Sequence, residues 1–99
     1  MKIKVSPFAL IDLEESVEYY NLQKESLGWD FAKIVDLSFE MIKSNPKLFP
    51  KVFQDVRKVV IDRFSFSIFF IENEDVIYIL GIFHTSRNPK TIQKRVKKL

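Results

Sequence analysis

The most constraining feature of this sequence is the run Val76–Phe83, which reads VIYILGIF and is hydrophobic at every position except Gly81. A strand with one face in water alternates apolar and polar residues, whereas a strand covered on both faces is apolar nearly throughout. The run is far shorter than the ~20 apolar residues that a membrane-spanning helix needs. It therefore predicts a central strand at Val76–His84 that is buried on both faces.

The rest of the chain from Val52 onward has a similar character. β-Branched and aromatic residues dominate it, and short polar stretches interrupt them where turns are expected. The pattern predicts three further strands at Val52–Phe53, Val56–Asp62 and Phe66–Ile71, with turns at 63–65 and 72–75. This half of the chain is therefore expected to form a small antiparallel sheet.

The N-terminal half has helical spacing instead. Lys2–Val5 alternates lysine with apolar residues and predicts a short strand, after which Ser6 and Pro7 supply an N-cap and a first helical residue. The helix that follows is predicted to bury an apolar stripe at spacings of three and four: Leu10, Leu13, Val17 and Tyr20. The acidic residues fall largely outside that stripe: Asp12, Glu14, Glu15 and Glu18. Of these, Glu14, Glu15 and Glu18 predict a solvated face.

A second helix follows a short connection at Leu27–Gly28, with Trp29 expected to seal that end of the helix pair. This helix should end near Asn45, because the residue before a proline avoids the helical region. The two helices then form an antiparallel hairpin. At the other end of the chain, Thr91–Leu99 is predicted to form a short basic helix or tail.

These elements predict one α+β domain over residues 1–99. In it, an N-terminal strand and an antiparallel helical hairpin pack on a small antiparallel β-sheet, followed by the short basic C-terminal segment. A length of 99 residues fits a single core and leaves no room for a second domain.

Composition excludes several kinds of site. The chain has no Cys, which rules out disulfides, thiolate metal sites and thiol nucleophiles, and its one His cannot build a metal site by itself. No glycine-rich phosphate loop is present, so neither a cofactor nor a metal is expected. Asp12 and Glu14 interrupt the N-terminal region before a long apolar run accumulates, which argues against a signal peptide. We expect a cytoplasmic protein that does not bind membranes.

The charge is distributed unevenly. Residues 1–45 hold 5 Lys+Arg and 8 Asp+Glu (net −3), whereas residues 46–99 hold 11 and 5 (net +6). Six of the basic residues lie within Arg87–Leu99, where no acidic residue occurs. The C-terminal half is therefore expected to attract an acidic partner or phosphate groups, between which charge alone does not choose.

Several segments, in this order along the chain, carry a resemblance to a known family. They are DLEE at 12–15, Tyr19–Tyr20, NPKLFP at 45–50, VRK at 56–58, RFSFSIFF at 63–70 and FHTSRNP at 83–89. Together with the element order, they resemble the RelE/ParE toxin superfamily over essentially the whole chain. The strand–turn–strand around 63–70 and the ending Phe-His-x-x-Arg-x-Pro are closer to the ParE side, the plasmid stabilisation proteins.

The resemblance implies a growth-inhibiting toxin of a type II toxin–antitoxin pair. Such a toxin is held inactive by a small cognate antitoxin, and it meets DNA only indirectly, through the DNA-binding part of that antitoxin. ParE-like toxins poison DNA gyrase by binding, whereas RelE-like toxins are endoribonucleases that cut mRNA on the ribosome. Ser67 occupies the position where RelE-type enzymes carry an arginine, and no tyrosine follows Arg87. We therefore expect gyrase binding, with mRNA cleavage as the alternative and a harmless degenerate member as a third possibility.

Basic residues of the sheet and the C-terminal segment are the candidate site residues. If the chain is a nuclease, its candidate catalytic residues are His84, Arg57 and Arg87, since an imidazole titrates near neutral pH and cations stabilise phosphorane charge. The candidate target- or antitoxin-binding residues are Arg57, Lys58, Arg63, Arg87, Lys94 and Arg95. A structural role for His84 and a solvated-edge role for the sheet cations are the alternatives. Strand alternation should send Arg57 and Lys58 to opposite faces.

Overall fold

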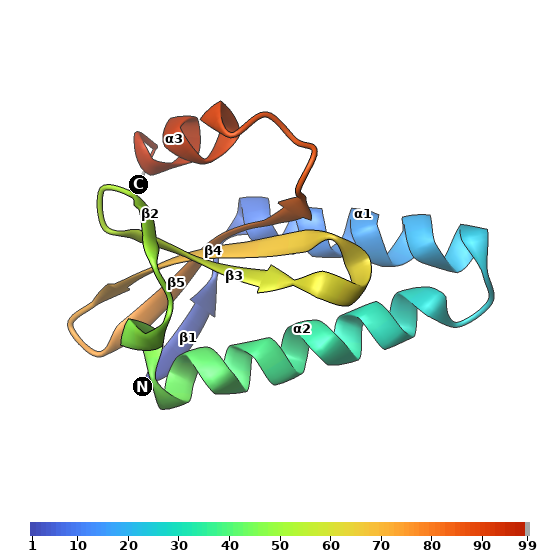
Figure 1. The fold of residues 1–99 in the computed structure, drawn as a ribbon, viewed down its shortest axis with the longest axis horizontal. Coiled ribbons are helices and arrows are strands. Elements are labelled where there is room, and N and C mark those ends of the chain that lie inside the picture. Colours follow the sequence, from blue (N-terminus) through green and yellow to red (C-terminus); the bar gives the residue numbers. More distant parts are fainter. Residues whose placement is uncertain (99) are drawn as a thin grey trace.

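The computed structural model describes residues 1–98, in which helices lie on both sides of a five-stranded sheet (Figure 1). The elements are β1 (Lys2–Val5), α1 (Pro7–Gln23), α2 (Leu27–Ser44), the 3-10 turn η1 (Pro46–Leu48), β2 (Lys51–Phe53), β3 (Val56–Ile61), the 3-10 turn η2 (Asp62–Phe64), β4 (Phe66–Asn73), β5 (Val76–His84) and α3 (Lys90–Val96). The predicted α+β class is confirmed. The predicted end of the C-terminal segment at Leu99 lies outside the described residues. No helix within residues 1–98 is both long and apolar enough to cross a membrane.

The strand order across the sheet is β1-β5-β4-β3-β2. The pairs among β2 to β5 are antiparallel, as predicted, but β1 joins the sheet parallel to β5, with Lys2 opposite Val76 and Val5 opposite Ile79. A parallel pair needs a long crossover, which the helical hairpin and the intervening strands supply here. The sheet is therefore mixed, and β5 is an inner strand with neighbours on both sides.

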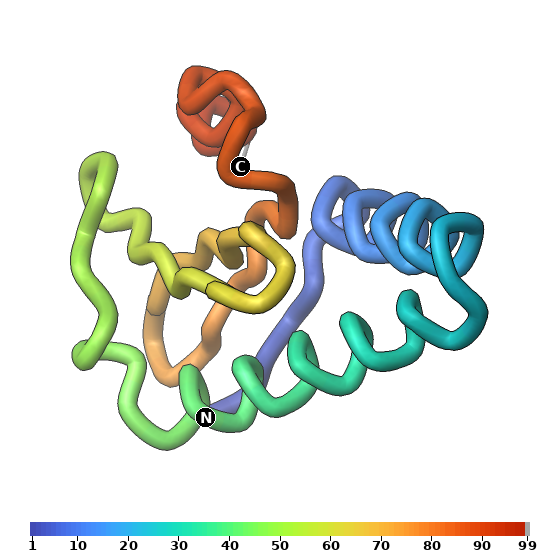
Figure 2. The backbone as a smooth tube through the Cα atoms, turned by 45° about the vertical axis from the view of Figure 1, so that its right-hand side comes forward, coloured from blue at the N-terminus to red at the C-terminus, as the bar shows by residue number. Residues whose placement is uncertain are grey.

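β5 is covered on both faces, as its apolar sequence predicts. Ile77, Ile79 and Ile82 belong to the main core, which α1 and α2 cover. Leu80 and Phe83 belong to a second core, closed by Ile92 and Val96 of α3 on the opposite side of the sheet (Figure 2). A register shift opposite Phe69 and Phe70 adds one residue to β5 and shifts the inside–outside alternation by one position, so that Ile82 shares the face of Ile77 and Ile79.

The start of α1 matches the sequence prediction, but its buried face differs. The Ser6 hydroxyl accepts a hydrogen bond from the Ala9 amide at 3.1 Å and caps the helix. Leu10, expected in the apolar stripe, is 48% exposed, and the buried positions are instead Ala9, Asp12 and Ser16. These shorter side chains bring α1 close to β5. Apolar spacing alone could not predict this face, because a buried carboxylate with partners takes the place of an apolar residue.

Tyr20 joins α1 to the core, as expected from its place in the stripe. Its ring packs against Phe31, Phe64 and Phe66. Its hydroxyl donates to the Phe64 carbonyl at 3.0 Å. Burial, and secondly the neighbouring Tyr19, raise the pKa of the Tyr20 phenol, which keeps the proton that this hydrogen bond uses.

The helical hairpin is closed by Gly28, which lies inside the first turn of α2 and not in the connection where it was predicted. Its amide donates to Asn21 Oδ1 at 2.7 Å, and a Cβ at this position would lie 2.1 Å from the Val17 carbonyl oxygen. Because the two helices touch at Gly28, the next residue, Trp29, points outward and is 62% exposed. The prediction that Trp29 seals the hairpin was wrong.

The β4–β5 hairpin turns at Glu74 and Asp75, which have φ values of 49° and 65°. Positive φ at both central residues is the type I′ geometry, which suits Asn-Gly and strains other residues. We expect the double variant Glu74→Asn/Asp75→Gly to raise the free energy of unfolding by about 1 kcal/mol. Urea denaturation would measure this gain. A variant with Glu14→Gln and Glu18→Gln removes two charges from a helix without relieving strain, and an equal gain there would contradict the explanation.

Candidate functional site

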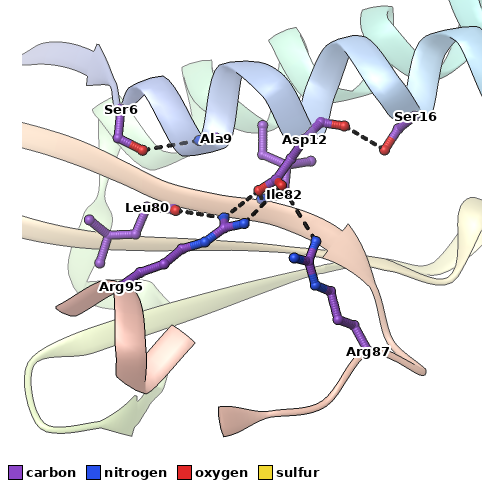
Figure 3. A network of polar contacts seen from close by, with 8 residues as sticks. All are labelled: Ser6, Ala9, Asp12, Ser16, Leu80, Ile82, Arg87 and Arg95. Atoms are coloured by element: carbon purple, nitrogen blue, oxygen red, sulfur yellow. Dashed lines mark hydrogen bonds and ion pairs between the residues drawn. The ribbon is translucent and has the colours of Figure 1, made fainter. Parts of the chain in front are cut away.

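The carboxylate of Asp12 is the centre of a polar network between α1, β5 and α3 (Figure 3). Asp12 is only 5% exposed, and its Oδ2 accepts a hydrogen bond from the Ile82 amide at 3.0 Å. The Arg95 guanidinium donates to both carboxylate oxygens, with Nη2 at 3.0 Å from Oδ1. Arg87 Nη1 lies 3.5 Å from Oδ1. Asp12, which lies outside the predicted apolar stripe, is therefore buried together with its partners.

This network occupies a sheet edge that β1 leaves open. β1 ends at Val5, and the last backbone hydrogen bond along this edge runs from the Ser6 amide to the Ile79 carbonyl at 3.0 Å. Beyond it, the Leu80 carbonyl accepts from Arg95 Nη1 at 3.0 Å, and Asp12 accepts from the Ile82 amide. Two side chains thus satisfy the backbone groups that a longer strand would have paired.

Gly81 provides the space for this arrangement. A Cβ on Gly81 would lie 2.9 Å from Arg95 Nη1 and 2.6 Å from a ring carbon of Phe83. The guanidinium groups of Arg87 and Arg95 lie over the Phe83 ring, at 4.9 and 5.3 Å from its centroid. The single glycine of β5 is therefore explained by the close approach of α3.

A basic pocket forms where α3 meets the start of α1. It has a volume of about 360 Å³ and is lined by Phe8, Arg87, Thr91, Lys94, Arg95 and Lys98. The Phe8 ring centroid lies 5.5 Å from the Arg95 guanidinium carbon and 5.6 Å from Lys98 Nζ. Three of the predicted binding residues, Arg87, Lys94 and Arg95, come together in this pocket.

A second cavity, the histidine pocket, lies between α1 and the end of β5. It has a volume of about 510 Å³ and is lined by Glu15, Ser16, Tyr19, Phe66, His84 and Ser86. His84 Nδ1 accepts a hydrogen bond from the Ser86 amide at 3.0 Å, so in the neutral ring the proton is on Nε2. The His84 ring stands edge-on to Phe66, with 5.5 Å between centroids. The pocket thus gathers a carboxylate, an imidazole and hydroxyl groups around an aromatic wall.

The remaining candidate residues line neither pocket. Arg57 faces the helices and donates to the Phe49 carbonyl at 2.6 Å, which fixes the segment before β2. Lys58 lies on the opposite face, 5.9 Å from the Phe69 ring centroid, as strand alternation predicts. Arg63 is exposed at the far end of the sheet and lies 3.8 Å from Asp30. The structure therefore separates Arg57 from Arg87 and His84, with which it was grouped as a candidate catalytic residue.

Sequence reasoning did not single out Phe8, Thr91 and Lys98 of the basic pocket, nor the Asp12 carboxylate beside it. Phe8 sits in the first turn of α1, and nothing in its spacing distinguishes it from a core residue. Asp12 had a signal in its neighbours, because Ala9 and Ser16 lie at helical spacing on either side of it and mark a face of small residues. That pattern is typical of a helix in close contact with another element.

Comparison with solved structures finds a chain with a similar fold. A chain of the chromosomal ParDE TA system from P. aeruginosa superposes with a TM-score of 0.76 at 19% sequence identity. The match covers 85% of this chain and 95% of that chain. No protein-family model and no curated protein matches the sequence. The chain therefore shares the fold of that ParDE chain, in agreement with the fold that the resemblance of segments such as FHTSRNP implies.

Proposed function

We propose that the chain is the toxin of a type II toxin–antitoxin system and that it acts by binding and inhibiting DNA gyrase. The observation that carries the proposal is the structural match to a chain of a ParDE TA system over 85% of the present chain. A small cognate antitoxin is the proposed partner that keeps it inactive, and DNA would be contacted only through that antitoxin. The cytoplasm, where both candidate targets are found, is the proposed compartment.

Binding is favoured over cleavage by the residues at the centre of the sheet. Ser67 is the residue that stands where RelE-type enzymes carry an arginine. It is 1% exposed and pairs with Phe83 across the strands, on the face that α3 partly covers. A buried hydroxyl there brings no positive charge to a scissile phosphate. This supports a toxin that works without chemistry of its own.

The arrangement of Arg87, Lys94 and Arg95 also supports a binding role. Arg87 and Arg95 lie over the Phe83 ring, and Arg95 is also held in place by its hydrogen bonds to Asp12 and the Leu80 carbonyl. Fixed cations beside an aromatic surface are common in protein–protein recognition, because little side-chain entropy is lost on binding. We propose that they contact the target or the antitoxin, with Lys58 and Arg63 as more distant contributors. Arg57 is the weakest candidate, since its guanidinium already binds a backbone carbonyl.

The order in which macromolecular synthesis stops tests the target. After induction of the protein in growing bacteria, we expect thymidine incorporation to fall before methionine incorporation and a DNA-damage reporter to rise. Gyrase poisoning acts first on DNA, which is the reason for this order. An earlier fall of methionine incorporation would refute the gyrase proposal, and unchanged growth would indicate a harmless member of the fold.

The histidine pocket is the one observation that favours the alternative, an mRNA endoribonuclease. His84, Glu15 and Tyr19 place acid–base groups around a single cavity, and general acid–base catalysis contributes about 10²–10⁴-fold to such reactions. For the proposed binding toxin we expect His84→Ala to retain growth inhibition within about threefold, whereas a nuclease would lose about 100-fold or more. Ser86→Ala, which removes only the hydroxyl beside His84 Nδ1, is the matched control.

A further inference from the structure

We propose that the basic pocket binds the terminal phosphate of a phosphate monoester. The proposal concerns the anionic group that this pocket accepts and does not depend on the toxin's target. Three features support it. Four cations line the pocket, and the Asp12 carboxylate already accepts hydrogen bonds from Arg95 and the Ile82 amide. Phe8 and Thr91 complete the lining beside the cations.

The charge around the pocket is strongly positive. Arg87, Lys94, Arg95 and Lys98 line a volume of about 360 Å³. Among the ion pairs of the described residues, Arg87 and Arg95 pair only with Asp12, and neither lysine takes part in one. One carboxylate therefore faces four cations. Because like charges confined together repel, an anion of two charges compensates them better than an anion of one.

Asp12 does not compete with a ligand for most of these cations. Its two oxygens already accept the Arg95 fork and the Ile82 amide, and its side chain is only 4% exposed. Arg87 lies at 3.5 Å from Asp12 and keeps 43% of its side chain exposed, so most of its donors remain available. Arg95 is fixed by Asp12 and the Leu80 carbonyl, which holds its charge at the back of the pocket. The result is a preorganised anion site with one fixed and three adjustable cations.

The size and lining of the pocket favour an ester over free phosphate. A phosphate group alone leaves much of the volume empty, and the Phe8 ring offers an apolar wall for an organic substituent. The Thr91 hydroxyl adds a hydrogen-bond donor beside the cations. A phosphate monoester carries nearly two charges at neutral pH, because its second pKa is about 6. An internal phosphodiester carries only one and is flanked by substituents on both sides. The structure therefore points to a terminal phosphate, either of a free nucleotide or of a nucleic-acid 5′ end.

Calorimetric titration of the full chain with adenosine 5′-monophosphate tests the site. We expect saturable one-to-one binding at pH 7.5 that weakens at pH 5.5, where the phosphate gains a proton. Lys94→Ala and Lys98→Ala should each weaken it about tenfold, the loss expected for one charge-assisted hydrogen bond. Lys97→Ala removes the same charge from an exposed position outside the pocket and should change affinity less than twofold.

Oligonucleotides distinguish the two sources of the phosphate. A pentanucleotide with a 5′-phosphate that binds more tightly than the mononucleotide would identify nucleic-acid ends as the ligand, and the reverse order would identify free nucleotides. Equal binding of the same pentanucleotide with a 5′-hydroxyl would overturn the proposal, since the diesters would then be sufficient. Absence of mononucleotide binding, or equal weakening by Lys97→Ala, would overturn it as well. Binding of a glutamate-rich peptide without any nucleotide binding would assign the pocket to protein recognition instead.

Discussion

Replacing Asp12 by alanine is expected to destabilise the domain by about 3–5 kcal/mol, the usual effect of removing one partner of a buried ion pair. The Arg95 side chain is 11% exposed, so without Asp12 its guanidinium is a buried charge with a single remaining acceptor, the Leu80 carbonyl. The Ile82 amide also loses its acceptor. For a domain of this size, the loss should lower the melting temperature by about 15 °C or more.

Thermal and urea denaturation of further variants tests whether the unpaired Arg95 charge causes the loss of stability in Asp12→Ala. Glu14→Ala removes an exposed carboxylate from the same helix and should change stability by less than about 0.5 kcal/mol. Asp12→Ala combined with Arg95→Met removes both charges and should recover part of the loss, because no buried charge is left unpaired. If the double variant were as unstable as the sum of its single variants, the two side chains would not be coupled, contrary to the geometry.

Alanine at Gly28 should also destabilise strongly, by about 2–4 kcal/mol, although alanine is the better helix former by about 1 kcal/mol. The added methyl group would lie 2.1 Å from the Val17 carbonyl oxygen and 2.7 Å from Asn21 Cγ. A backbone carbonyl cannot move without shifting α1, so the hairpin must open. The hydrogen bond from the Gly28 amide to Asn21 would then weaken as well.

Two comparisons test this steric explanation by chemical denaturation. Gly81→Ala brings a methyl group against the side chains of Phe83 and Arg95, which can move, and should have a smaller effect than Gly28→Ala. Adding Asn21→Ala to Gly28→Ala removes the side-chain clash but leaves the carbonyl clash. Full recovery of stability in that double variant would show that the backbone contact is unimportant.

The strands were well predicted because their signals are local. The apolar run ending at Phe83 set both the limits of β5 and its burial, and Ser6–Pro7 set the start of α1. β4 ends two residues later than predicted, because Glu72 and Asn73 of the predicted turn still pair with β5. The parallel pairing of β1 with β5 is not local, since it depends on where the whole helical hairpin carries the chain.

The candidate site was predicted only in part, for a related reason. Basic residues crowded near the C-terminus predicted a cationic surface, and Arg87, Lys94 and Arg95 do lie together. The sequence could not reveal that Asp12 organises them, because an acidic residue on an amphipathic helix ordinarily faces water. Burial of that carboxylate becomes favourable only when Arg95 and an unpaired strand edge are both present, and neither is close to it in the chain.

The contact between Asp12 and Arg95 joins residues that are 83 positions apart. During synthesis from the N-terminus, Asp12 is made 83 residues before Arg95 and has no guanidinium partner until Arg95 has been added. The nascent domain can form its helical hairpin and sheet earlier, but the edge of β5 beyond β1 has no arginine to close it. Docking of α3 is therefore expected to be the final folding event. A chain released before Arg95 is added would contain every residue of the main core and leave this carboxylate unpaired.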